Sequence, residues 1–340
     1  MRHAHGGYNA SATKHAYTMI ATRILRRRRV LIVGCGDVGA RCVEQLRARR
    51  APLRIIALTS QAARRAELRA AGAVPLVGNL DQRASLGRLA GLAPVVLHLA
   101  PPQPSGIDDR RTRALIAALS APGRRAAARP PGPPRRAARI VPERFRPPTL
   151  VYASTSGVYG DCGGVRVDET RTPRPANPRA RRRVSAERQL RDATARGALS
   201  ARIVRIPGIY AANRLPLARL ERGTPALCEA DDVYTNHIQA DDLATILLRA
   251  ATRGRASRAY HASDDTELKM GDYFARVARA FGLAPPPRIT RAEAERQLDP
   301  SLLSFMRESR RLVNARMKSE LRIALRYPNV DDFLRGVARP

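Results

Sequence analysis

The chain has 340 residues, of which 44% are apolar, so it can bury a sizeable core and form about two domains. No run of about 18 uncharged apolar residues occurs, which excludes a membrane-spanning helix. The four cysteines are scattered without a CxxC pair. This argues against a disulfide framework or a metal site and favours a reducing, cytoplasmic location.

The formal net charge is +33, because 62 lysine and arginine residues face 29 acidic residues. A basic field of this size attracts nucleic acid or an anionic membrane. However, only three of the basic residues are lysine, and much of the excess is spread along the chain. This pattern indicates an arginine-rich composition, so we expect no membrane partner and rank nucleic acid well below a small molecule.

In chain order, residues 1–28 are basic and lack an apolar periodicity, which predicts a disordered tail. From residue 29, short apolar runs alternate with amphipathic stretches. This alternation is typical of a parallel sheet whose strands are joined by crossover helices. The predicted strands are 30–33, 53–58, 74–77, 95–99, 149–153 and 201–206, with helices at 38–49, 62–71 and 112–119.

Residues 121–139 break this pattern with five prolines and six arginines, which predicts a solvated insertion or, alternatively, a proline-rich recognition tract. After residue 206 the pattern predicts helices at 241–253, 270–281 and 291–297, and short strands near 259–261 and 287–289. The expected fold class is therefore α/β. A Rossmann doubly wound parallel sheet would span residues 29–206, and a smaller C-terminal α/β substrate portion residues 207–335.

Residues 34–39 read Gly-Cys-Gly-Asp-Val-Gly, after the first strand and at the start of the first helix. In this context the pattern GxGxxG is typical of dinucleotide binding. The first glycine permits a tight turn, the second lets the backbone approach a pyrophosphate, and the third lets helix and strand pack closely. The alternative is a glycine turn that binds nothing. The predicted cofactor contacts here are Gly34, Gly36, Asp37, Val38 and Gly39.

The second predicted strand ends in Thr59 and Ser60, and Arg64 and Arg65 follow before the first acidic residue, Glu67. NAD-binding proteins usually place Asp or Glu at this strand end to bind the ribose diol. Hydroxyls and arginine instead suit the 2′-phosphate of NADP, because guanidinium binds phosphate oxygens as a fork. We therefore predict that Thr59, Ser60 and Arg64 bind NADP, with NAD as the alternative. The alternative is that Arg64 and Arg65 are ordinary surface residues of an arginine-rich chain.

Residues 151–160, Val-Tyr-Ala-Ser-Thr-Ser-Gly-Val-Tyr-Gly, resemble the strand-5 signature of extended short-chain dehydrogenases, the NAD-dependent epimerase/dehydratase family. Residues 204–210 and 236–243 resemble its sixth strand and its IHVDDLA segment, so the resemblance covers roughly 29–335. It implies a Rossmann fold, a nicotinamide cofactor and a catalytic hydroxyl at Thr155. It also implies further cofactor contacts at Asn79, Leu80, Ala100, Pro101 and Pro207.

The chain departs from this family at its Tyr-x-x-x-Lys motif, whose positions are taken by Arg179 and Arg183. The tyrosine normally exchanges a proton with the substrate, but arginine stays protonated near neutral pH. Val33 also stands where the extended members have a glycine. These departures resemble the atypical branch of short-chain dehydrogenases, which lacks the standard tyrosine. We expect Arg183 to bind the nicotinamide ribose and Arg179 to bind an anionic substrate.

A threonine hydroxyl is too weak an acid to act alone, so Thr155 is expected to orient a substrate oxygen. Tyr159 remains as a candidate acid, although this position is commonly structural in the family, and Tyr210 lies further off. His98 is expected to be a core residue. Residues 307–311 are expected to form a solvated helical face, with phosphate binding as the alternative.

The sequence therefore predicts an atypical short-chain oxidoreductase or sugar-nucleotide-epimerase-like protein that acts on a small, plausibly anionic molecule as a monomer or homodimer. The loss of the tyrosine makes a non-catalytic NAD(P)-binding sensor or interaction protein the main rival. Nucleic-acid binding is a third class. The substrate itself is not determined by the fold.

Overall fold

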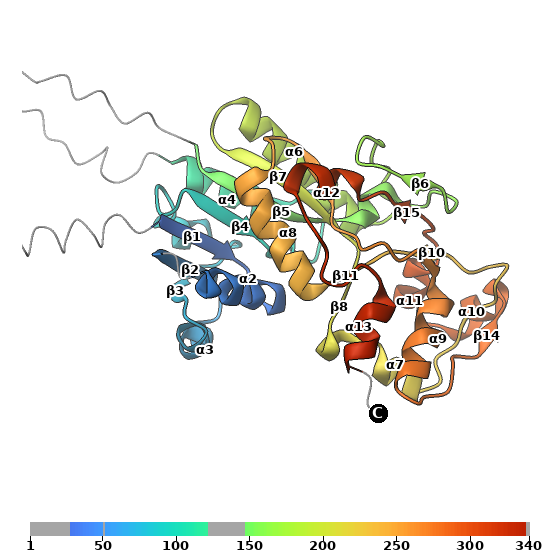
Figure 1. Ribbon diagram of the computed structural model, residues 1–340. Coiled ribbons are helices and arrows are strands. Elements are labelled where there is room, and N and C mark those ends of the chain that lie inside the picture. The colour runs from blue at the N-terminus through green and yellow to red at the C-terminus, as the bar shows by residue number, and fades with distance from the viewer. Residues whose placement is uncertain (1–27, 50–51, 122–146, 338–340) are drawn as a thin grey trace, which may run out of the picture.

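The computed structural model describes residues 28–49, 52–121 and 147–337. Nearly all of the predicted tail and of the predicted insertion therefore lies outside the described residues. Within them, seven parallel strands form one sheet in the order β12-β7-β5-β4-β1-β2-β3, and helices cover both of its faces (Figure 1). This topology confirms the predicted Rossmann α/β fold.

The strands of this layer match the predicted runs closely, because each strand is a short apolar segment with its own turn signals, whereas α6 and α12 were not predicted. The strands are β1 (Arg28–Val33), β2 (Leu53–Thr59), β3 (Val74–Val77), β4 (Val95–His98), β5 (Thr149–Thr155), β7 (Ser200–Ile206) and β12 (Ala259–His261). The helices are α2 (Asp37–Ala48), α3 (Arg65–Ala70), α4 (Arg110–Ser120), α6 (Pro178–Ala195), α8 (Ala240–Arg253) and α12 (Ala315–Leu321).

The two faces of the sheet pack into two separate apolar cores. Side chains alternate along β1, so Val30 and Ile32 join the core formed with α2 and α8. Leu31 and Val33 join the opposite core, which α4 and α6 cover. A strand buried on both faces has to be apolar at every position, which explains why β1 reads as a continuous apolar run.

The chain returns to the sheet after residue 206. β12 pairs in parallel with β7, with Ala259 opposite Ile203, and α8 lies against α2. The sheet thus takes its last strand from the stretch 207–335, which the sequence pattern had assigned to the C-terminal portion. β12 has only three residues, too few for an apolar pattern that distinguishes a sheet strand from a strand of a second unit. The division at residue 206 stays a prediction.

The remaining elements gather on one side of the molecule (Figure 1). Four strand pairs occur there: β6 (Arg166–Val167) with β15 (Arg311–Leu312), β8 (Gly208–Tyr210) with β11 (His237–Gln239), β9 (Ala226–Leu227) with β14 (Arg288–Ile289), and β10 (Tyr234–Thr235) with β13 (Leu268–Lys269). The helices are α7 (Leu217–Glu221), α9 (Met270–Ala280), α10 (Arg291–Gln297), α11 (Pro300–Phe305) and α13 (Val330–Val337). No helix in the described ranges is long and apolar enough to cross a membrane.

A buried ion pair joins α6 to the sheet. Arg205 of β7 donates to both carboxylate oxygens of Glu187 of α6, with Nη2–Oε2 at 2.7 Å and Nε–Oε1 at 3.1 Å. The hydroxyl of Ser154 on β5 donates to the same carboxylate at 2.7 Å. The two charged side chains are 2% and 1% exposed, so each depends on the other for its charge to be tolerated in the interior.

Removing one member of this pair should therefore be costly. We expect Glu187→Ala to lower the free energy of unfolding by about 3–5 kcal/mol, because it leaves the Arg205 guanidinium buried without its partner. Urea denaturation followed by circular dichroism measures the change. As a control, Glu295→Ala breaks an exposed pair with Arg307 and should cost less than about 1 kcal/mol. Equal effects of the two substitutions would contradict this interpretation.

Candidate active site

The glycine loop between β1 and α2 has the backbone that close approach of a ligand requires. Gly34 has φ +84°, and a Cβ there would lie 2.5 Å from the backbone nitrogen of Ala100, so only glycine fits. Around Gly36, a Cβ would meet no atom within 4 Å, so its backbone is open to an approaching group. At Gly39, a Cβ would lie 3.2 Å from the Cys35 sulfur, which shows how closely α2 packs on the loop.

The N-terminus of α2 completes this loop. No side chain caps its first turn, which begins at Asp37, so the free N–H groups suit phosphate oxygens. The Asp37 carboxylate itself pairs with Arg214 at 2.9 Å and Arg41 at 3.3 Å. Val38 is half-buried against the apolar core. Hence Asp37 offers a ligand its backbone, because its side chain is occupied within the protein.

The side chains at the end of β2 do not form a vacant binding site for a phosphate. Thr59 is buried and accepts a hydrogen bond from the Gln61 backbone at 3.2 Å, whereas Ser60 is exposed. Arg64 donates to both carboxylate oxygens of Glu67, at 2.9 Å and 2.6 Å. Arg64 lies near the glycine loop: burial raises the pKa of the Cys35 thiol, and the Arg64 charge opposes that shift. Arg64, the predicted phosphate-binding arginine, is thus close to the glycine loop, but its guanidinium is already paired with the Glu67 carboxylate.

The segments after β3 and β4 are tied together beside the loop. Arg111 forms an ion pair with Asp81 and donates to the backbone oxygen of Pro101 at 3.1 Å. The side-chain oxygen of Asn79 accepts from the Asp81 backbone at 2.9 Å and so shapes the first of these segments. The structure therefore brings together the cofactor residues predicted in these segments: Asn79, Leu80, Ala100 and Pro101.

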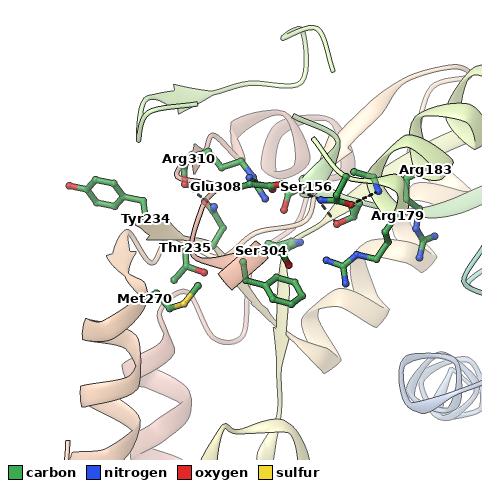
Figure 2. Close-up of a pocket in the computed structure, with 17 residues that line it drawn as sticks. Ser156, Arg179, Arg183, Tyr234, Thr235, Met270, Ser304, Glu308 and Arg310 are labelled. Atoms are coloured by element: carbon green, nitrogen blue, oxygen red, sulfur yellow. Dashed lines mark hydrogen bonds and ion pairs between the residues drawn. The ribbon is translucent and has the colours of Figure 1, made fainter. Parts of the chain in front are cut away.

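A cavity of about 360 Å³ opens beyond the carboxyl ends of β5 and β7 (Figure 2). Parallel α/β sheets bind their ligands at this edge. The side chains and backbone that line the cavity come from β5, α6 and the C-terminal elements. They include Thr155, Gly157, Asn177, Arg179, Arg183, Pro207, Tyr234, Phe305, Glu308 and Arg310.

Thr155 ends β5 and begins the floor of the cavity. Its hydroxyl oxygen accepts from the backbone N–H of Gly157 at 3.2 Å, which leaves its proton available to a ligand. A Cβ on Gly157 would lie 3.6 Å from this oxygen and 3.9 Å from Glu308 Oε2. The space above Gly157 is therefore bounded by a hydroxyl on one side and a carboxylate on the other.

Two arginines of α6 border the same space. Asn177 caps the helix by accepting from the Ala180 backbone at 2.9 Å, which puts Arg179 in the first turn and Arg183 one turn later. Arg183 donates to the backbone oxygen of Ala153 at 2.6 Å and is thereby tied to β5. Arg179 is exposed, and its guanidinium carbon lies 4.8 Å from the centre of the Phe305 ring. Both arginines expected from the family's motif positions thus reach the cavity.

Glu308 and Arg310 line the cavity, although the sequence pattern placed them in the solvated face expected at 307–311, with phosphate binding as the alternative. Arg310 donates to Glu308 Oε2 at 2.9 Å, and Asn177 donates to Glu308 Oε1 at 3.3 Å. Both charged side chains are 11% exposed. The expected solvated helical face at 307–311 is therefore wrong, because this stretch runs between α11 and β15 without forming a helix. No local pattern marks Glu308, whose neighbours come from β5 and α6.

Tyr159, the other predicted catalytic residue, does not join Thr155 and Arg179. Its side chain is 1% exposed, and its hydroxyl lies 2.5 Å from both His261 Nε2 and Arg205 Nη1. Burial raises the pKa of Tyr159 to about 12. The His261 Nδ1 proton is donated to a backbone oxygen at 2.9 Å, so Nε2 is left to accept the tyrosine proton. The phenol is therefore committed to the interior of the fold.

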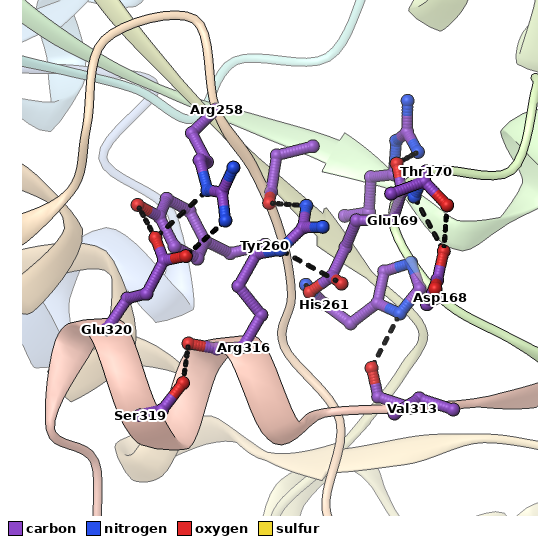
Figure 3. Close-up of polar contacts among 12 residues, drawn as sticks. Asp168, Glu169, Thr170, Arg258, Tyr260, His261, Val313, Arg316, Ser319 and Glu320 are labelled. Atoms are coloured by element: carbon purple, nitrogen blue, oxygen red, sulfur yellow. Dashed lines mark hydrogen bonds and ion pairs between the residues drawn. The ribbon is translucent and has the colours of Figure 1, made fainter.

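Figure 3 shows the same histidine within a wider polar network that holds α12 against β12. Glu320 accepts from Arg258 at 3.0 Å and from the Tyr260 hydroxyl at 3.1 Å. Glu169 accepts from the His261 backbone at 3.0 Å and pairs with Arg316. These contacts stabilise the packing of α12 on β12. Among the described residues, no group of three or more His, Cys, Asp or Glu side chains is placed to hold a metal ion.

Comparison with known proteins identifies this architecture. A family model described as the NAD dependent epimerase/dehydratase family matches residues 30–263. A solved structure of a conserved protein of unknown function from Silicibacter pomeroyi DSS is 27% identical, covers 91% of this chain and 98% of its own, and superposes with a TM-score of 0.71. No curated protein matches the chain.

Two further structures share the fold at lower identity. UDP-N-acetylglucosamine 4-epimerase from Bacillus cereus is 16% identical, with 92% and 98% of the two chains covered and a TM-score of 0.63. A DesIV double mutant, a dTDP-glucose 4,6-dehydratase from Streptomyces venezuelae with NAD and DAU bound, is 19% identical, with 91% and 95% covered and a TM-score of 0.67.

The buried histidines predict how stability depends on pH. Burial lowers the pKa of His98, His237 and His261 to about 3, so they stay neutral in the fold while the unfolded chain protonates them near pH 6.5. Asp264 acts in the opposite direction. Burial raises its pKa to about 7, so on acidification the folded protein binds this proton at a higher pH than the unfolded chain does. The unfolded state then binds about two more protons, and stability falls as the pH falls.

Between pH 6 and pH 5 we expect the free energy of unfolding to drop by about 2.4 kcal/mol. Urea titrations at the two pH values measure it. A stability that is constant or rises on acidification would contradict neutral burial of these histidines.

Proposed function

Because this chain belongs to the NAD dependent epimerase/dehydratase family, we propose that it is an enzyme that binds a nicotinamide dinucleotide along the glycine loop and oxidises or reduces a small anionic molecule in the cavity. The observation that carries the proposal is the composition of the cavity. It combines the Thr155 hydroxyl at the end of β5 with an exposed guanidinium, Arg179, at the start of α6.

The residues around the glycine loop fit such a cofactor. Gly36 has open space at its backbone, and the uncapped first turn of α2 offers N–H groups for a pyrophosphate. When bound, the nicotinamide accepts or supplies the hydride of the reaction. Arg183 and Pro207 would hold the nicotinamide end, since both line the cavity beside Thr155.

The charge at the start of α6 supports an anionic substrate. The first turn holds no acidic residue, yet it carries Arg179 and Arg181, and cations at a helix N-terminus oppose the helix dipole. No ion-pair partner of Arg179 is found among the described residues. A carboxylate or phosphate beside Arg179 would relieve this repulsion, and guanidinium binds both groups as a fork. A sugar nucleotide and a hydroxy acid both carry such a group.

The enzyme interpretation is tested with a panel of UDP-N-acetylglucosamine, dTDP-glucose, UDP-glucuronic acid, malate and lactate. Net oxidation with NADP or NAD is followed by absorbance, and epimerisation or dehydration, which returns the cofactor to its starting state, by analysis of the products. Cofactor binding is followed by calorimetry. We expect cofactor binding and turnover of at least one compound. Arg179→Ala should raise KM at least tenfold, whereas Arg181→Ala, an exposed arginine of the same helix outside the cavity, should change it less than twofold.

The outcomes separate the candidate functions. Gly36→Val should abolish cofactor binding, because its side chain fills the space where the pyrophosphate approaches. Binding in the wild type without turnover of any compound would favour the non-catalytic sensor. No cofactor binding at all would contradict the proposal as a whole.

We also propose that NADP is the preferred cofactor, bound through Arg64 after Arg64 releases Glu67. The carboxylate competes with the 2′-phosphate for the same guanidinium, so Glu67→Gln should strengthen NADPH binding several-fold and leave NADH binding unchanged. Arg64→Ala should weaken NADPH binding alone. Calorimetric titration of both reduced cofactors measures these affinities. Tighter binding of NADH by the wild type would contradict the preference.

A further inference from the structure

We infer that Glu308 is the acid–base group of the reaction, in place of the tyrosine whose family position Arg179 occupies. The assignment rests on the proposed oxidoreductase function. It gives the cavity the proton acceptor that its arginines cannot provide, because guanidinium groups stay protonated at all ordinary pH values.

Few other groups that line this cavity could exchange a proton with a substrate. The described residues that line it include hydroxyls, amides and arginines, together with one carboxyl group, Glu308, and one phenol, Tyr234. Aliphatic hydroxyls are too weakly acidic to transfer a proton alone. The Tyr234 ring lies 4.7 Å from the Arg311 guanidinium carbon and points away from Arg179 and Arg183 (Figure 2). Glu308 is therefore the group of this cavity that is placed to exchange a proton with a substrate.

The geometry puts Glu308 opposite Thr155. The position of a Cβ on Gly157 lies 3.9 Å from Glu308 Oε2 and 3.6 Å from Thr155 Oγ1. A substrate hydroxyl in that space is within reach of both groups, so Thr155 orients the oxygen while Glu308 receives the proton. Arg310 and Asn177 occupy two of the roughly four acceptor sites of the carboxylate, which leaves capacity for the substrate.

The proton and electron balance of the step is simple. In the oxidative direction the substrate O–H bond breaks and its proton passes to Glu308 Oε2. The C–H bond on the same carbon breaks, and its hydride is transferred to the oxidised nicotinamide dinucleotide. The carbonyl double bond forms, and Glu308 returns its proton to solvent. In the reductive direction the protonated Glu308 donates to the forming alkoxide.

The charges around Glu308 come from several elements. Arg310 forms an ion pair with it from the same stretch of chain. Asp161, between β5 and β6, and Arg171, after β6, both act on the pKa of the Cys162 thiol, as do Glu308 and Arg310, so all four charges lie near this thiol. Arg310 therefore faces the carboxylate that has to accept the proton of the substrate.

The test uses the full chain loaded with NADP or NAD and the compound of the panel that the wild type oxidises. Glu308→Gln, Glu308→Asp and the control Glu295→Gln are compared in kcat. Calorimetry gives the dissociation constant of the same compound in the loaded protein. We expect Glu308→Gln to lower kcat about 100-fold or more and to bind the compound within about threefold of the wild type.

Glu308→Asp should keep part of the rate, and Glu295→Gln should match the wild type. Should Glu308→Gln fail to fold, Gly157→Ala is the second test, because a methyl there makes only ordinary contacts and fills the space between the two groups. It should keep the melting temperature and lose substrate binding and turnover. Retention of both by Gly157→Ala would overturn the proposed geometry.

A Glu308→Gln variant with a kcat near that of the wild type would overturn this assignment and leave the proposed function intact. A loss of substrate binding as large as the loss of rate would also overturn it, since Glu308 would then only position the substrate. A wild type that binds the cofactor and oxidises none of the compounds would contradict the proposed function, and the assignment would fall with it.

Discussion

The ion pair between Arg205 and Glu187 fixes the part of the molecule on which the cavity depends. Both charges are almost completely buried, and they face each other across the contact between α6 and the sheet. Glu187 lies one helical turn after Arg183 and two turns after Arg179, so the three side chains share one face of α6. The pair thereby sets the rotation of the helix and keeps the two arginines at the end of β5.

The same arginine explains why Tyr159 does not serve the cavity. Arg205 donates to the Tyr159 hydroxyl as well as to Glu187, and the phenol in turn faces His261 on β12. This chain of contacts links β5, α6, β7 and β12. Because the Tyr159 proton is donated within this network, we assign the tyrosine a structural role. The group that exchanges a proton with the substrate then has to come from another segment, and the loop before β15 provides Glu308.

The fold was predictable because its signals are local. Each strand of the first half is a short apolar run, and the glycine loop between β1 and α2 has a recognisable spacing. What the sequence pattern did not show was set by contacts between distant residues. It predicted the short strand near 259–261, but only the pairing with β7 makes β12 a strand of the central sheet. The cluster at 307–311 looked like a charged helix face because its composition says nothing of the cavity it borders.

For the candidate site, too, the sequence predicted some residues and missed others. Motif positions predicted that Thr155, Arg179 and Arg183 would meet, and they lie together in the structure. Glu308 was missed because it is 131 residues from Asn177, its hydrogen-bond partner on α6. The partner of Arg64 was closer at hand: Glu67 follows it by three residues, a spacing at which helical side chains pair. That local signal was present in the sequence.

The central claim is that the glycine loop and the cavity serve one bound nicotinamide dinucleotide. A crystal structure of the full chain soaked with NADPH tests it most directly. The account predicts the pyrophosphate at the backbone of Gly36 and the nicotinamide at the mouth of the cavity, beside Thr155 and Pro207. A dinucleotide whose nicotinamide lies away from the cavity, or crystals that take up none at saturating concentration, would contradict it.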